Sequence, residues 1–361
     1  MMLPTHTPST KSSHRPAWRA EADVDHVPAI DITPFLDGSG KNAVARRVAR
    51  ACEAIGFLTL TGHGIAPSAI DRAFEWSRLF FDQPQTRKDR WHPAGASRQR
   101  GYHGGASRAL AQSLGDETPS DLRESYYLGP VDDHRAYFRS QPDAAEAYAP
   151  NIYPTEPPGA AEALVTLYRS FERLSADLLR LFAVALDQPE DYFADHIRRH
   201  FSILASHHYP PLETPPAPGQ LRAGAHTDYG ALTILAMTEG QGGLEVRMQD
   251  GSWHPVRPSP EALVVNLGDM MARWTNERWT STLHRVVNPD DLGSLRSRRQ
   301  AIGYFMHPDF DATIDAIPSC VSRNEAPKLP PISAGAHIAM KIAASYDGVS
   351  YHEPRGLNIE D

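Results

Sequence analysis

The second half of the chain is a succession of short apolar runs, and this feature restricts the fold more than any other. The runs are rich in β-branched residues, begin at Phe201 and are separated by turns rich in proline and glycine. These turns are 210–224, 239–243, 250–251, 258–260 and 288–293. Strands at such even spacing are typical of a β-sandwich or a barrel. The sequence therefore predicts a β core here.

Residues 160–186 give the clearest helical pattern in the chain, because apolar residues recur every three or four positions. The residues of this stripe are Leu164, Leu167, Phe171, Leu174, Leu178, Leu181, Phe182 and Ala185. The segments 43–55 and 68–81 predict two shorter helices, and 57–60 predicts a strand. We expect the long helix to lie across a sheet and support it.

His226 and Asp228 lie two residues apart, directly before the apolar run 231–237. Because successive side chains of a strand point to opposite faces, this imidazole and this carboxylate would point the same way. His284 lies in another β-branched run and would add a second imidazole from a neighbouring strand. Two histidines and one carboxylate form the facial triad that binds iron(II) and leaves coordination positions open. With 17 histidines in the chain, a His-x-Asp pair also arises by chance. The flanking sequence is therefore needed to decide whether His226 and Asp228 belong to a metal site.

The flanking segments resemble the isopenicillin-N-synthase-like branch of the iron(II)/2-oxoglutarate-dependent dioxygenases. The matching segments, in the family's order, are 51–57, 61–65, 151–154, 207–211, 224–230, 265–270, 273–276, 281–287 and 299–308. The resemblance implies an α+β fold with a mainly β core, the double-stranded β-helix or jelly roll, backed by helices. It implies iron(II) bound by His226, Asp228 and His284, with 2-oxoglutarate and O2 as co-substrates.

The resemblance also assigns Arg299 and Tyr209 to the distal carboxylate of 2-oxoglutarate. An arginine suits this role because its planar guanidinium can donate to both carboxylate oxygens. Strand alternation places Arg299, Ala301 and Phe305 on one face, and the small residues beyond the arginine leave room for an acid. Arg296 and Arg298 would then face elsewhere.

Two positions depart from the family pattern. Ala301 stands where the family's Arg-x-Ser motif has a serine, so a hydrogen bond of about 1.5–3 kcal/mol to a charged group is lost or comes from another residue. His207 replaces the asparagine of Asn-x-Tyr, although Tyr209 is kept. An oxidase that uses no 2-oxoglutarate, or one that uses another acid, therefore stays open. A non-catalytic ligand-binding module on the same fold is a third alternative, but the presence of both histidines, the aspartate and the arginine argues against it.

Five side chains are candidates for a substrate pocket, namely Tyr102, His103, Tyr126, His207 and Phe305. Residues 89–120 show little periodicity, and a long irregular segment in a compact domain is usually functional or mobile. Residues 121–129 resume a strand pattern that we expect in the cavity wall. His207 and His208 are adjacent, so one would face the cavity and the other the helical layer. His63, Asp269, Trp274 and Trp279 are expected to have structural roles.

Composition narrows the possible partners of this 361-residue chain. The net charge of −8 argues against a general nucleic-acid binder, because phosphate contacts need clustered lysine and arginine. Only two cysteines, Cys52 and Cys320, are present, and they cannot build a disulfide framework or a cysteine-based zinc site. With no apolar leader or membrane span in the sequence, we expect a cytoplasmic protein. The sequence does not indicate the oligomeric state.

The chain is expected to divide into four parts. Residues 1–25 would form a disordered tail, 26–150 an N-terminal dioxygenase region, 151–346 the jelly-roll core and 347–361 a C-terminal tail. The expected function is hydroxylation, desaturation or cyclisation of a small metabolite, of the kind that secondary metabolism produces. Which compound is oxidised depends on the shape of the pocket.

Overall fold

The structure is a computed structural model that describes residues 26–94, 99–105, 109–111, 119–238, 242–290 and 297–347. The expected N-terminal tail, nearly all of the expected C-terminal tail, and Arg296 lie outside the described residues. The proposed boundaries at residues 150 and 346 stay predictions.

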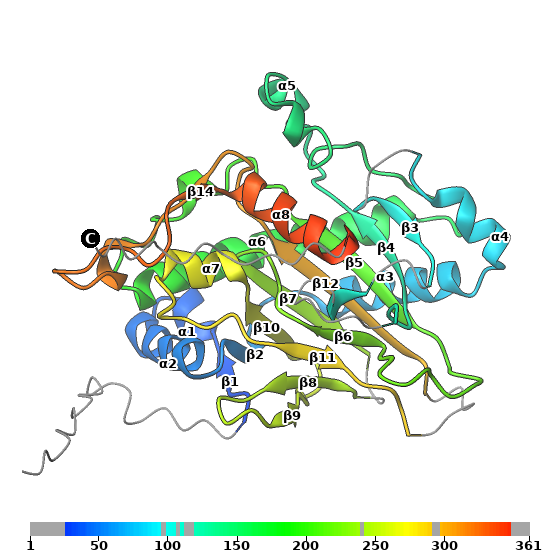
Figure 1. Ribbon diagram of the computed structural model, residues 1–361, viewed down its shortest axis with the longest axis horizontal. Helices are drawn as coiled ribbons and strands as arrows, with labels where there is room; N and C mark the ends of the chain where they lie inside the picture. The colour runs from blue at the N-terminus through cyan, green and yellow to red at the C-terminus, as the bar shows by residue number, and fades with distance from the viewer. Residues whose placement is uncertain are drawn as a thin grey trace, which may run out of the picture.

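Two sheets form the core (Figure 1), and all strand pairs except β1 with β2 are antiparallel. The larger sheet has the order β1-β2-β10-β7-β12-β5-β4-β3, and the smaller sheet has the order β6-β11-β8-β9. The strands of the larger sheet are β1 (Ala29–Asp31), β2 (Phe57–Thr61), β3 (Gly101–His103), β4 (Glu124–Leu128), β5 (Ile203–Tyr209), β7 (Leu232–Met237), β10 (Leu263–Leu267) and β12 (Arg299–Met306). Those of the smaller sheet are β6 (Ala223–His226), β8 (Leu244–Arg247), β9 (Trp253–Pro255) and β11 (His284–Val286). This arrangement is the predicted jelly-roll core.

Three helices cover one face of the larger sheet. They are α2 (Lys41–Ala54), α3 (Pro67–Phe81) and α6 (Ala160–Ala185). The long helix α6 contacts α2, α3, β7 and β12, and its apolar stripe is buried. Each helix lies within two residues of the segment predicted from periodicity. The prediction that helices support the β core is therefore confirmed.

The shorter elements complete the described chain. The remaining helices are α1 (Thr33–Leu36), α4 (Gln85–Lys88), α5 (Arg135–Phe138), α7 (Asp269–Trp274) and α8 (Ala334–Asp347), and β13 (Thr313–Ile314) pairs with β14 (Ile332–Ser333). Asp269 begins α7 and accepts an ion pair from Lys341 of α8 at 2.9 Å, while Trp274 and Trp279 are buried in the core. Among the described residues, no helix combines the length and apolar character needed to cross a bilayer.

The smaller sheet lies beyond the larger sheet, on the side away from α6 (Figure 1). An apolar cluster joins the two sheets, and it includes Val246 and Val286 from the smaller sheet and Val264 from the larger one. Burial of such side chains stabilises the contact by roughly 25 cal/mol per Å² of apolar surface. The packing fixes the mouth between the sheets, where β6 ends and β11 begins.

Candidate metal centre and substrate pocket

His226, Asp228 and His284 meet at this mouth. His226 is the last residue of β6, and it pairs directly with His284 on the antiparallel strand β11. Asp228 follows β6, so its position comes from the turn after the strand. The candidate ligand atoms all lie within 4.8 Å of one another. Asp228 Oδ1 is 3.8 Å from His226 Nε2 and 3.7 Å from His284 Nε2. Both separations are short enough for one ion to lie about 2.1 Å from the oxygen and from each nitrogen.

Hydrogen bonds to backbone carbonyls set the tautomer of both histidines. His226 Nδ1 lies 2.8 Å from the Gly224 carbonyl oxygen, and His284 Nδ1 lies 3.0 Å from the Thr282 carbonyl oxygen. Because a carbonyl oxygen only accepts, each Nδ1 carries the proton and donates it. Each Nε2 therefore presents a lone pair, which is the arrangement found in metal-binding histidines.

Asp228 is oriented by two donors that hold its other oxygen. Thr233 Oγ1 donates to Asp228 Oδ2 at 2.5 Å, and Asn266 Nδ2 donates to the same atom at 2.7 Å. Oδ1 is the oxygen that faces the two imidazoles. The turn after Asp228 is tightly packed, since a Cβ atom on Gly268 would lie 2.2 Å from the Gly230 carbonyl oxygen. The donor set and its hydrogen bonds fit a divalent iron ion.

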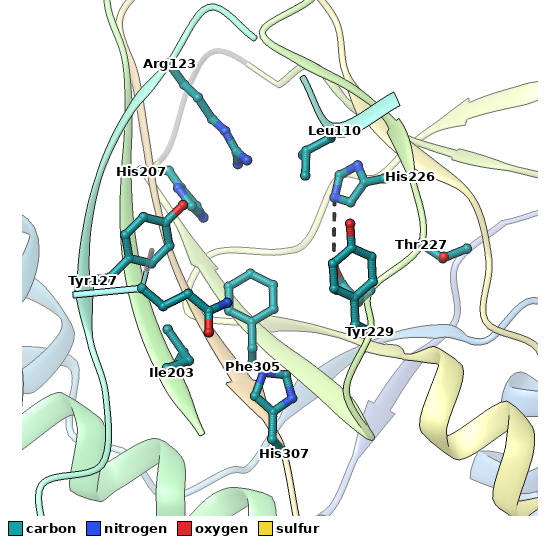
Figure 2. Close-up of a pocket in the computed structure, with 12 residues that line it drawn as sticks. Leu110, Arg123, Tyr127, Ile203, His207, His226, Thr227, Tyr229, Phe305 and His307 are labelled. Atoms are coloured by element: carbon teal, nitrogen blue, oxygen red, sulfur yellow. Dashed lines mark ion pairs between the residues drawn. The ribbon is translucent and has the colours of Figure 1, made fainter. Parts of the chain in front are cut away.

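An open cavity adjoins the three candidate ligand residues (Figure 2). Its lining residues are Gln99, Leu110, Arg123, Tyr127, Ile203, His207, His226, Thr227, Asp228, Tyr229, Phe305 and His307. Burial lowers the pKa of His307 to about 3, so this imidazole is neutral at physiological pH. The cavity is thus aromatic and imidazole-rich, with few formal charges.

Arg299 and Tyr209 face each other across β12 and β5, as the resemblance implies they should. They are cross-strand neighbours, and the guanidinium carbon lies 4.7 Å from the centre of the tyrosine ring. Arg299 is buried, Nη2 contacts Met237 Sδ at 3.0 Å, and Nη1 has no hydrogen-bond partner among the described residues. Ala301 is buried on the same face and packs in the cluster between the sheets. Arg298 pairs with Asp82 at 2.7 Å and faces away, as predicted.

A second buried arginine lies close to Arg299. Arg222 donates to the carbonyl oxygens of Pro210 and Ser297, and its Nε has no partner among the described residues. Burial, and secondly the positive charge of Arg299, lower the pKa of Arg222 to about 10. Two guanidinium groups buried together are costly without an anion, so this end of the barrel is chemically suited to a carboxylate.

The predicted pocket residues are only partly brought together. His207 and Phe305 line the cavity, and His208 points to the other face, where its ring stacks on Phe81 of α3 at 5.1 Å. The alternation predicted for His207 and His208 is therefore confirmed. The irregular segment contributes Gln99 and Leu110 to the lining.

Tyr126, Tyr102 and His103 require a correction. Tyr126 packs on Trp76 and Phe80 beneath the helices, so the expectation that it lines the pocket is wrong. Its neighbour Tyr127 faces the cavity instead, because adjacent side chains of a strand point to opposite faces of the sheet.

Tyr102 is buried against the same helical layer, where its hydroxyl donates to Glu124. His103 stacks edge-on against Tyr127, behind the lining, and hydrogen-bonds the Arg100 carbonyl. Both residues therefore support the wall from outside the cavity.

Eight of the twelve lining residues were not named as candidates from the sequence, and Arg123, Tyr229 and His307 are three of these eight. Tyr229 directly follows the ligand Asp228, and His307 lies two residues after Phe305, so strand alternation would have found the latter. Arg123 lies two residues before Ser125 and four before Tyr127, which is the period of the cavity face of β4. His63, which was expected to have a structural role, lies in the loop after β2, and its Nε2 lies 3.0 Å from the Glu261 carbonyl oxygen.

Two family models match the chain. Residues 27–156 match the N-terminal region of the non-haem dioxygenase in morphine synthesis, and residues 200–308 match the 2OG-Fe(II) oxygenase superfamily. A 2-oxoglutarate-Fe(II) type oxidoreductase of Metarhizium majus is 31% identical over 89% of this chain and 95% of its own. A proline hydroxylase of Petromyces alliaceus is also 31% identical, over 84% of this chain and 93% of its own.

Solved structures agree with the sequence matches. The full-length T7H of Neurospora crassa, in complex with alpha-KG, superimposes with a TM-score of 0.77 at 28% identity over 88% of this chain and 96% of that one. The same protein has been solved with alpha-KG and thymine. The chain therefore belongs to the isopenicillin-N-synthase-like family of 2OG-Fe(II) oxygenases and is an iron(II)- and 2-oxoglutarate-dependent dioxygenase.

Proposed function

We propose that His226, Asp228 and His284 are the iron ligands of this dioxygenase. The observation that carries the proposal is the convergence of three ligand atoms whose protonation and orientation are already fixed. Both Nδ1 atoms donate to carbonyl oxygens, and Asp228 Oδ2 accepts from Thr233 and Asn266, so Nε2, Nε2 and Oδ1 face one point. Bound iron(II) supplies the redox chemistry that couples decarboxylation of 2-oxoglutarate to oxidation of a C–H bond.

The distal carboxylate of 2-oxoglutarate is assigned to Arg299, with Tyr209 beside it. Arg299 Nη1 is a buried donor with no partner among the described residues, and the nearby charge of Arg222 adds to the attraction for an anion. Ala301 leaves space on the same face and offers no hydroxyl, so Arg222 and Tyr209 take over the contribution that the family's serine would make. The alternatives that do without 2-oxoglutarate lose their support because the relatives and solved neighbours use or bind it.

The substrate is a small molecule that is hydroxylated, desaturated or cyclised in this cavity. His207 and Phe305 line the cavity, as proposed from the sequence, together with Tyr127. The thymine complex of the Neurospora protein supports a small-molecule substrate. The two cysteines are separate and free, Cys52 being buried, which favours a reducing compartment such as the cytoplasm.

Paired histidine variants test the metal assignment. His284→Ala removes one ligand, and we expect it to lose iron-dependent binding of 2-oxoglutarate and to reduce succinate formation by at least about a hundredfold. His254→Ala is the matched control, because His254 lies on β9 of the same small sheet, outside the cluster. Full turnover by His284→Ala would disprove the assignment, whereas an equal loss in both variants would point to damaged folding.

A further inference from the structure

Arg123 places a positive charge in the substrate cavity. It lies just before β4, and Figure 2 shows its guanidinium end directed into the cavity between His207 and Leu110. Its side chain is only 10% exposed. Arg123 and Asp228 are the only Arg, Lys, Asp or Glu residues among the described residues that line the cavity. Because Asp228 is proposed to bind the metal, Arg123 is the charged residue of this described lining that can contact the substrate.

Asp121 connects Arg123 to the metal-binding strand. Asp121 Oδ2 lies 3.6 Å from Arg123 Nε, and Asp121 Oδ1 accepts a hydrogen bond from the Gly224 amide at 2.9 Å. The Gly224 carbonyl in turn accepts from His226 Nδ1. One carboxylate thus forms an ion pair with the Nε side of the guanidinium and a hydrogen bond with the strand that carries His226. A guanidinium has five N–H donors in a planar fork, and the end opposite Nε suits a second carboxylate.

The rest of the cavity wall suits a hydrocarbon body. Tyr127, Ile203 and Phe305 line it on the side of the larger sheet, and Tyr229 lies beside the ligand cluster. A compound with a charged head and an apolar ring or chain would place its head at Arg123. Its body would then lie along these residues toward the metal centre.

We propose that the substrate is a small organic acid and that Arg123 binds its carboxylate, held in position by Asp121. The proposal rests on the proposed function and narrows its substrate class. Arg123 is thereby a specificity-determining residue for the oxidation. The same geometry places the oxidised carbon in the apolar part of the molecule, away from the acid group.

The test compares acids with amides of the same shape. The full-length enzyme is loaded with iron(II) and 2-oxoglutarate without oxygen, and binding is measured by calorimetry for phenylacetate, 3-phenylpropionate, cyclohexanecarboxylate and their primary amides. We expect at least one acid to bind about tenfold or more tightly than its amide, as charge-assisted hydrogen bonds would give. In Arg123→Gln the preference should fall below about threefold, and Arg123→Lys should keep part of it, because the charge remains while the fork is lost.

Arg135→Gln is the matched control, since Arg135 forms an exposed ion pair with Asp133 far from the cavity, and it should keep the acid preference. No acid preference in the unmodified enzyme, or an undiminished preference in Arg123→Gln, would overturn the proposal. Iron-dependent binding of 2-oxoglutarate is measured first in every variant. Its absence from the unmodified enzyme would refute the proposed function itself, and its presence in Arg123→Gln shows that the variant has folded.

Discussion

The cluster around Glu124 on one face of the larger sheet and Arg299 on the other face differ in how far their polar atoms are paired. On the face under α3, Glu124 accepts hydrogen bonds from Lys88 Nζ at 2.6 Å, Tyr102 Oη at 2.5 Å and His208 Nδ1 at 2.7 Å. Of this cluster, only His208 Nε2 lacks a partner within the described part of the chain. On the opposite face, the neighbouring strand β12 carries Arg299, whose Nη1 is without a partner in that same part. The Glu124 cluster is paired within the protein, whereas we propose that a bound ligand completes the pairing of Arg299.

The pKa values of Glu124 and His208 agree with the hydrogen bonding of this cluster on the helix side, which consists of Lys88, Tyr102, Glu124 and His208. Burial works to raise the pKa of Glu124, but the hydrogen bonds from His208, Lys88 and Tyr102 outweigh it and hold this pKa below its ordinary value. Burial lowers the pKa of His208 despite the nearby carboxylate. At neutral pH the cluster therefore consists of one ion pair and a neutral histidine, and its charges balance. The comparison predicts that changes on this face alter stability, whereas changes on the cavity face alter ligand binding.

The largest effect is expected from Glu124→Gln. This change leaves the Lys88 ammonium buried without its counter-charge, and breaking a buried ion pair costs about 3–5 kcal/mol of unfolding free energy. Urea unfolding measures it. Glu277→Gln breaks an exposed pair with Lys328, and this control should lose no more than about 1 kcal/mol. Equal losses in the two variants would show that the buried cluster has no special role.

Arg299→Gln should behave in the opposite way. We expect the Kd for 2-oxoglutarate to rise about 10- to 100-fold, because charge-assisted hydrogen bonds are lost. The unfolding free energy should stay equal or rise, because the change removes a buried cation that has no ion-pair partner among the described residues. Arg298→Gln alters the adjacent residue, which pairs with Asp82. Arg298→Gln should leave the Kd for 2-oxoglutarate unchanged. A destabilised Arg299→Gln with an unchanged Kd would remove the distinction between the two faces.

Acid should weaken the helix-side cluster. Since the folded pKa of His208 is below its unfolded value, the unfolded chain takes up the proton first, and stability falls as pH drops below about 6.5. The contribution of one such group is at most about 1.4 kcal/mol per pH unit. Unfolding at pH 7.5, 6.5 and 5.5 should show a shallower dependence in His208→Gln than in the unmodified protein or in His254→Gln. Parallel curves for all three would exclude His208 as a source of acid sensitivity.

The smallest effect is expected from Ala301→Ser on the cavity face. The new hydroxyl restores the serine of the family's motif and can donate to the carboxylate near Arg299, which should lower the Kd for 2-oxoglutarate about fivefold. Ala236→Ser, on β7, is the control because Ala236 belongs to the core under the helices. A weaker or unchanged affinity in Ala301→Ser would mean that the bound acid does not pass beside residue 301.

Local periodicity predicted the elements and many of the side-chain directions. The stripe of α6 predicted its ends to within one residue, and alternation correctly predicted that His207 and His208 lie on opposite faces of β5. Those positions were predictable because, once the buried face of one side chain in a strand is known, alternation gives the face of every other side chain in that strand.

Alternation alone did not show which of Tyr126 and Tyr127 faces the cavity. The sequence pattern of β4 is the same whichever of its two faces is turned toward the cavity. The register with β5, which pairs Tyr126 with Ser206 and Tyr127 with Ala205, decides the question, and it depends on contacts distant in sequence. Arg123 was missed for the same reason. The Lys88–Glu124–His208 cluster likewise joins three elements whose proximity no local pattern reveals.

The most direct test of the metal centre is a crystal structure of the full-length protein with manganese(II) in place of iron(II), together with 2-oxoglutarate and without oxygen. Anomalous scattering locates the manganese independently of any model. We predict one ion about 2.0–2.3 Å from His226 Nε2, Asp228 Oδ1 and His284 Nε2. An ion bound elsewhere, or contacted by fewer than these three side chains, would contradict the account.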